Sequence, residues 1–425
     1  MHALRQASRV GARWTPSLSQ RRAPRGPLQS IRRSSQQRQP KKPFVILSMD
    51  GGGCRGYMSI RLLERVCDEA PGFLDRVDLF AGTSTGSILA AFLAGGASPG
   101  EAASYYEEYV PAIFGRPRNL VRRAWDAKFS NRPLKDALRT YFGDATVAQL
   151  PKHFLAPALR VDGEASSTTS AEVWRLSQSR EGGWRPAVFS NLPAVRGARP
   201  DVELKISDAL LRSSAAPTIL PLYQNYGDGG IWANNPTMLA VAKAKLHLGL
   251  DPSDVRVLSV GAGSWARRVV EPTASEKDLD LGLADWAPHL LEMVIDASGM
   301  TTDMEASFLL RENYTRLSPL IPQGVSLALD DPSTLQRQLE YAKHTDIKKA
   351  VEFAQRIVAE PASILELPDE PLGDSVHDLK EVDRLKLVDR AWADAAAKWQ
   401  QEKSTDDFGS RKRRSLENWR RTREG

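Results

Sequence analysis

Residues 44–56 read FVILSMDGGGCRG, and residues 77–93 read VDLFAGTSTGSILAAFL. Both stretches begin with a short apolar run that predicts a buried strand, and both continue through a glycine-rich turn. Helical spacing of apolar residues follows each turn, over residues 58–66 and 87–93. Strand, glycine turn and helix, twice in succession, predict a mainly parallel sheet with helices on its faces. The sequence therefore indicates the α/β class.

Further elements are expected along the chain. Residues 99–142 are predicted to be helical, and SPGE at residues 98–101 is typical of a helix start. The other apolar patterns predict strands near 154–161, 172–176, 187–190 and 255–260, and helices over 205–216 and 236–247. From about residue 275 the pattern is helical and increasingly charged.

The composition excludes several classes of protein. The chain has 425 residues, of which 41% are hydrophobic and 26% charged, as in soluble globular proteins. Its most apolar stretch, residues 88–97, is far shorter than the roughly 20 residues that a membrane-spanning helix needs. Two cysteines, Cys54 and Cys67, are too few for a disulfide framework and match no zinc-site spacing. We therefore expect neither an integral membrane protein nor a disulfide-rich secreted one.

The net charge of +6 belongs to the ends of the chain. Residues 1–42 contain nine Arg and two Lys with no acidic residue, and the remainder has 47 basic against 52 acidic residues. This distribution argues against a nucleic-acid-binding protein. We expect a disordered basic tail over 1–42, a folded domain over 43–330 and a helical, charged extension over 331–425. The tail is compatible with a cytoplasmic or peripheral membrane location, and its acid-poor composition leaves mitochondrial targeting as an alternative.

Residues 82–86, GTSTG, match the G-x-S-x-G pattern of a nucleophile elbow. A serine on a sharp strand-to-helix turn needs small neighbours, which Gly82, Thr83, Thr85 and Gly86 supply. Such a turn exposes the hydroxyl, and the N-terminus of the following helix favours the anion of acyl transfer. Ser84 is thus a candidate nucleophile; the alternative is a βα turn without catalytic function.

Residues 51–56 also match G-x-G-x-x-G, the fingerprint of dinucleotide-binding folds. An oxidoreductase of that kind is the first alternative function. Asp50 argues against it, because a carboxylate there would repel a pyrophosphate, and no acidic residue follows the second strand to bind a ribose. The other use of such a turn is an oxyanion hole, with backbone amides from Gly51, Gly52 and Gly53 and positive charge from Arg55.

A base for Ser84 is less obvious. None of the six histidines lies in a glycine turn, and residues 228–230, DGG, form a third such turn. Asp228 can act as the base if burial raises its proton affinity. His289 and His377 remain candidates for a conventional triad.

These motifs together resemble the patatin-like phospholipase family. The resemblance rests on ILSMDGGGCRG, DLFAGTSTGSILA, SSAAPTILP and DGGIWANNP, in this order, and covers roughly residues 43–265, more loosely to 330. It implies a three-layer α/β/α fold and hydrolysis of acyl esters of lipids. Within it Ser84 corresponds to the nucleophile and Asp228 to its partner in a dyad without histidine. The motif also includes Gly56, Gly229 and Gly230, and its glycine turn corresponds to the oxyanion hole.

The resemblance implies neither metal nor organic cofactor, and a phospholipid or other acyl glycerolipid as substrate. The aromatic residues of segment 99–142 are expected either to line an acyl pocket or to be ordinary core: Tyr105, Tyr106, Tyr109 and Phe114. A lipid-binding protein of the same fold with an inactive site remains a further alternative. The oligomeric state cannot be inferred from the sequence.

Overall fold

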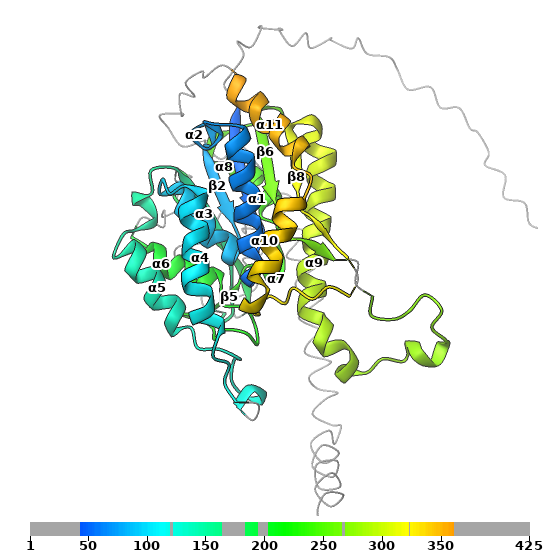
Figure 1. Cartoon of the computed structure of the whole chain (residues 1–425). Helices are drawn as coiled ribbons and strands as arrows, with labels where there is room; N and C mark the ends of the chain where they lie inside the picture. Colours follow the sequence, from blue (N-terminus) through cyan, green and yellow to red (C-terminus); the bar gives the residue numbers. More distant parts are fainter. Residues whose placement is uncertain are drawn as a thin grey trace, which may run out of the picture. The chain divides into compact units, whose positions relative to one another are not determined.

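A seven-stranded sheet forms the centre of the fold (Figure 1). The computed structural model describes residues 43–119, 122–163, 183–193, 203–265, 268–322 and 324–360. The strands are β1 (Phe44–Met49), β2 (Leu79–Gly82), β3 (His153–Arg160), β4 (Arg185–Ser190), β5 (Tyr226–Asp228), β6 (Val255–Val260) and β8 (Tyr314–Leu317). Their order is β4-β3-β2-β1-β6-β8, and β5 pairs with β3.

Most of the sheet is parallel. Strands β3, β2, β1, β6 and β8 run in one direction, whereas β4 and β5 are antiparallel to β3. Met49 at the end of β1 is in register with Gly82 of β2 and with Val260 of β6. Because the carboxyl ends of parallel strands share one edge, the first two glycine turns lie side by side.

Two hydrophobic clusters cover the two faces of the sheet. Val45, Leu47 and Met49 pack on one side, with α1 (Gly56–Glu69), α3 (Thr85–Ala94) and α4 (Pro99–Phe114). Phe44 and Ile46 pack on the other, with α8 (Thr237–Leu248) and α9 (Leu283–Leu310). Alternate residues of a strand point to opposite faces, so β1 is buried on both. The predicted three-layer α/β/α fold is confirmed.

The predicted helical segment 99–142 is two helices. α4 begins at Pro99 with the expected cap, since the Ser98 hydroxyl accepts from the Glu101 amide and the Glu101 carboxylate accepts from the Ser98 amide. It ends at Phe114, before Gly115, and α5 covers Arg132–Phe142. The connection between them is irregular, with one 3₁₀ turn at Arg122–Ala124.

Shorter elements complete the fold. They are α2 (Phe73–Arg76), α6 (Ile206–Ser213), α7 (Gly230–Ala233) and the parallel pair β7 (Ser264–Trp265) and β9 (Leu320–Ile321). The strand predicted near 172–176 lies outside the described residues, as do the tail over 1–42 and residues 361–425.

The hydrophobic core continues beyond residue 330. Helices α10 (Leu335–His344) and α11 (Lys348–Ala359) pack against α1, and Ala350, Phe353 and Ile357 belong to the same cluster as α1 and α3. The part of the expected extension that the structure describes is thus integrated into the folded core. Within the described ranges, no helix is both long enough and apolar enough to cross a membrane.

Candidate active site

Ser84 lies on the sharp turn between β2 and α3, with a left-handed backbone conformation (φ 54°). A side chain rarely adopts this conformation without support from its surroundings. The neighbouring glycines explain how the turn closes: a Cβ on Gly82 would lie 2.0 Å from the Gly86 carbonyl oxygen, and one on Gly86 would lie 2.4 Å from that of Met49. Both glycines of the predicted elbow are therefore sterically required.

Hydrogen bonds from other elements hold the elbow in place. The Ser84 amide donates to the Ser213 hydroxyl (3.1 Å), which itself donates to the Pro157 carbonyl on β3 (2.7 Å). The Thr83 hydroxyl donates to the Ala233 carbonyl (2.6 Å), and the Tyr106 hydroxyl donates to the Thr85 carbonyl (3.2 Å). The strained conformation of Ser84 is thus fixed by α4, α6 and β3 together.

Asp228 ends β5 and lies opposite Ala158 of β3. The following glycine allows this close approach, because a Cβ on Gly229 would lie 2.3 Å from the Pro157 carbonyl oxygen. One carboxylate oxygen of Asp228 accepts from the Gly230 amide (2.7 Å), and the Ser84 side chain lies close enough to the carboxylate to lower its pKa. The structure therefore brings together the predicted nucleophile and its predicted partner, 144 positions apart in the sequence.

The carboxyl group of Asp228 has a pKa closer to neutral pH than that of an ordinary aspartate. Its burial raises the pKa from 3.8 to about 6, and the hydrogen bonds from Ser84 and Gly230 limit the rise. A base with such a pKa is ionised at pH 7 and binds a proton readily during the reaction.

Two of the three glycines in the loop after β1 line the pocket, and the third has its amide bound elsewhere. The Gly51 amide donates to the Asn234 carbonyl (3.1 Å), so it is already engaged. Gly52 and Gly53 line the same pocket as Ser84, and Gly53 has a left-handed conformation (φ 57°). Of the three glycines predicted for the oxyanion hole, these two lie in the pocket wall with Ser84.

Arg55 is buried beneath this loop. Its Nε donates to the Gly52 carbonyl (3.3 Å), which also accepts from the Arg55 amide (3.0 Å). In a trans peptide the C=O and the following N–H point in opposite directions. Fixing the Gly52 carbonyl on Arg55 therefore turns the Gly53 amide away from Arg55.

The neighbouring Cys54 is inert packing rather than a reactive thiol. The side chain is fully buried, and burial raises its pKa.

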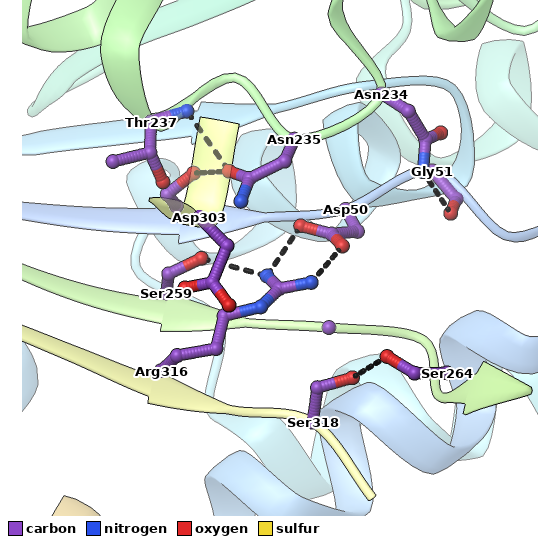
Figure 2. A network of polar contacts seen from close by, with 12 residues as sticks. Asp50, Gly51, Asn234, Asn235, Thr237, Ser259, Ser264, Asp303, Arg316 and Ser318 are labelled. Atoms are coloured by element: carbon purple, nitrogen blue, oxygen red, sulfur yellow. Dashed lines mark hydrogen bonds and ion pairs between the residues drawn. The ribbon is translucent and has the colours of Figure 1, made fainter. Parts of the chain in front are cut away.

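A buried ion pair, which the sequence analysis missed, anchors the start of the loop (Figure 2). Arg316 of β8 donates to both carboxylate oxygens of Asp50, at 2.8 and 2.5 Å, and to the Ser259 hydroxyl of β6 (2.8 Å). Asp50 is 5% exposed. Burial raises the pKa of Asp50 and the Arg316 charge opposes that rise, whereas Asp50 raises the pKa of Arg316. A lone arginine in a short strand carries no sequence signal for this role.

Asn234 fixes the other side of the loop (Figure 2). Besides accepting from the Gly51 amide through its carbonyl, it donates from its side chain to the Gly51 carbonyl (3.3 Å). It belongs to the WANNP segment after the third glycine turn, which was quoted above without a role being assigned. The loop after β1 and the turn after β5 are thereby tied to each other.

The pocket beside Ser84 and Asp228 is almost entirely apolar. It encloses about 820 Å³ including its open mouth, and its walls come from the end of α4, the start of α5, the turn after α6 and α9. The four aromatic residues expected either here or in ordinary core all line it: Tyr105, Tyr106, Tyr109 and Phe114. No histidine lines the pocket in the part of the chain that the structure describes. Such a cavity suits a hydrocarbon chain.

Comparison with known proteins agrees with this geometry. Residues 47–241 match the family model described as patatin-like phospholipase. CotR of Bacillus subtilis is 29% identical over 337 residues, which cover 74% of this chain and 98% of CotR. A cGAMP-activated phospholipase of Pseudomonas aeruginosa is 27% identical, covering 75% of this chain and 90% of that protein. Patatin-like protein 3 of Arabidopsis thaliana is 28% identical, covering 52% and 59%.

These relatives support lipid acyl hydrolase activity and do not favour a dinucleotide-binding oxidoreductase. The family match spans all three glycine turns, from the first strand to the helix after Asp228. Over residues 47–241 the chain is therefore similar to the patatin-like phospholipase family.

Proposed function

We propose that the protein hydrolyses fatty-acyl esters of phospholipids or other glycerolipids through a Ser84–Asp228 dyad. One observation carries the proposal: a serine held at a positive φ lies beside a buried aspartate of pKa about 6, and both line an apolar pocket. The strained turn presents the hydroxyl, the aspartate accepts its proton and the pocket accepts the acyl chain.

The reaction proceeds in two halves. Ser84 Oγ attacks the ester carbonyl carbon while Asp228 takes the hydroxyl proton, which gives a tetrahedral oxyanion. The C–O bond to the alcohol then breaks, and the leaving alkoxide takes the proton from Asp228. A water molecule next attacks the acyl-serine ester and transfers a proton to Asp228; collapse releases the fatty acid and returns the proton to Ser84 Oγ.

The amides of Gly52 and Gly53 are the proposed oxyanion donors. Both residues line the pocket with Ser84, whereas the amide of Gly51 is bound to Asn234. Arg55 acts through the Gly52 carbonyl, because its hydrogen bond there fixes the peptide that carries the Gly53 amide. Losing one such donor typically costs about 10²–10³ in kcat.

Substitution of the dyad tests the mechanism. Ser84→Ala in the full chain should abolish cleavage of a p-nitrophenyl ester and of defined phospholipids, and should prevent labelling by a fluorophosphonate probe. Unchanged hydrolysis would refute the assignment of Ser84. If the wild-type chain neither cleaves esters nor labels, it is a lipid-binding protein with an inactive site instead.

Comparing Asp228→Asn with His289→Ala and His377→Ala decides between a dyad and a triad. The proposal predicts that Asp228→Asn loses activity and that both histidine variants keep it. A histidine variant as inactive as Ser84→Ala would show that the base is misassigned.

A further inference from the structure

The connection between α4 and α5 forms a closed loop at the rim of the pocket. We call residues 115–119 and 122–128 the rim loop. Its base is closed by the Arg118 amide, which donates to the Lys128 carbonyl (2.8 Å), and by the Arg118 side chain, which donates to the Ala127 carbonyl (2.9 Å). The Lys128 amide then donates to the Thr218 carbonyl (2.7 Å).

Both ends of the rim loop join walls of the pocket. It follows Phe114, which lines the pocket, and its far end is bound to the turn at residues 216–220, which also lines it. The loop therefore extends outward from the pocket edge, as Figure 1 shows for the segment between α4 and α5.

The tip of the rim loop combines an exposed aromatic ring with positive charge. Trp125 is 89% exposed, and Arg122 and Arg123, which precede it closely in the sequence, are exposed as well, against a single exposed acidic residue, Asp126. Tryptophan, which has an apolar ring and a polar N–H, is enriched at protein interfaces and in the interfacial belts of membranes. Tryptophan together with arginine is typical of groups that sit at the headgroup level of a membrane.

The first half of α9 forms the opposite side of the same pocket. Leu291 and Ile295 line it, and the neighbouring Met293 and Val294 are 41% and 43% exposed. The apolar surface thus continues from the pocket wall onto the outside of the helix. Acidic residues both precede and interrupt it: Asp280 and Asp285 are exposed, and Glu292 and Asp296 beside Met293 and Ile295 are half-exposed, so the contact on this side must be apolar rather than charge-driven.

We propose that the rim loop and the first half of α9 dock on an anionic lipid surface, with Trp125 and Met293 entering it and the arginines contacting lipid phosphates. The proposal rests on the proposed function, because the pocket between the two elements would receive an acyl chain from that surface. A lipid surface fits better than a protein partner, since the exposed apolar groups are continuous with the cavity that holds the hydrocarbon chain.

Flotation of the full chain with vesicles tests the surface. Vesicles of phosphatidylcholine with phosphatidylglycerol are compared with phosphatidylcholine alone at about 0.1 M salt, where charges are screened beyond about 10 Å. Arg122→Glu/Arg123→Glu should lower partitioning onto the anionic vesicles at least about tenfold. Trp125→Ala should lower it by about tenfold on the same vesicles. All variants keep residues 1–42, so any contribution of the basic tail is common to them.

Two control variants match these changes elsewhere on the surface. Lys348→Glu/Lys349→Glu makes the same charge change at the start of α11. This site is away from the glycine loop, because the nearby Thr345 carbonyl accepts a hydrogen bond from Arg65 in the second half of α1. Phe308→Asp changes an exposed apolar residue of α9 that is about 22 Å along the helix from Met293. Both controls should float like the wild type, whereas Met293→Asp should not.

Several results would overturn the proposal. One is unchanged flotation of the Trp125 and arginine variants; another is an equal loss in the lysine or Phe308 control. A third is that Met293→Asp turns a dimer into a monomer and leaves vesicle binding intact, which would make this face an interface between copies. Hydrolysis of a soluble p-nitrophenyl ester keeps the two proposals apart: docking variants should retain it, and Ser84→Ala should lose it but still float.

Discussion

Replacing Arg316 by methionine should destabilise the fold strongly, because it leaves the Asp50 carboxylate buried without its cation. The two side chains meet through two hydrogen bonds of 2.8 and 2.5 Å, and Asp50 is only 5% exposed. For unit charges about 4 Å apart, the usual spacing of the charge centres in such a pair, the attraction is about 4 kcal/mol at an effective dielectric constant of about 20. Removal of one partner from a buried pair usually costs about 3–5 kcal/mol, so the two estimates agree.

The cost should depend on pH in a defined direction. Burial already raises the pKa of Asp50, and loss of Arg316 removes the charge that opposes this rise. Below its folded-state pKa, Asp50 is neutral and no longer needs a cation. The deficit of Arg316→Met relative to wild type should therefore be largest at alkaline pH and shrink as the pH falls through the raised pKa of Asp50.

Urea unfolding followed by circular dichroism at pH 8 and pH 5 measures this deficit. The double variant Asp50→Asn/Arg316→Met should recover most of the stability, since neither charge remains. Lys205→Met is the control, because it breaks an ion pair with Asp144 that is largely exposed and should change stability far less. An Arg316→Met midpoint equal to that of wild type at pH 8 would refute the reasoning.

Other consequences follow from the site. Ester hydrolysis should fall as the pH drops below about 6, where Asp228 becomes protonated, and a flat pH–rate profile from 5 to 8 would contradict its role as base. A pKa raised from 3.8 to about 6 means that ionised Asp228 destabilises the fold above pH 6 by on the order of 2–3 kcal/mol; Asp228→Asn should therefore melt higher than wild type at pH 8 while being inactive. Gly82→Ala should lower stability by roughly 1–3 kcal/mol and remove activity, because its Cβ would overlap the Gly86 carbonyl. Gly299→Ala in α9, where a Cβ meets nothing within 4 Å, should instead raise stability by about 0.5–1 kcal/mol in thermal melts.

The parts of the fold that the sequence predicted depend on local chemistry. Gly82 and Gly86 are needed by one tight turn, so their spacing around Ser84 is visible in five consecutive residues. The apolar run of β1 is buried on both faces, and its register beside β2 places the two glycine turns at one edge. Convergence of these turns follows from parallel topology and could be inferred without coordinates.

Long-range pairings could not be inferred in this way. Arg316 reaches Asp50 only because β8 joins β6 with Arg316 opposite Ser259, and nothing in a four-residue strand specifies that neighbour. The engagement of the Gly51 amide by Asn234 likewise depends on a contact 183 positions apart. By contrast, the sequence of α11 indicates which face of the helix is buried, because Ala350, Phe353 and Ile357 repeat at helical spacing and form that face.

The two buried aspartates at this edge of the sheet illustrate how environment assigns chemical roles. Asp50 and Asp228 each follow or end a strand, each precedes glycines, and burial raises the pKa of each. Asp50 is bound at both oxygens by a guanidinium, so its carboxylate is fixed in place and engaged by a permanent cation. For Asp228, only the hydrogen bonds from Ser84 and Gly230 oppose the rise in pKa that burial causes. The Asp228 carboxylate can therefore take up a proton near neutral pH, as the proposed mechanism requires. Whether a cation accompanies the carboxylate therefore separates the anchor, Asp50, from the proposed base, Asp228, although both are aspartates in similar turns.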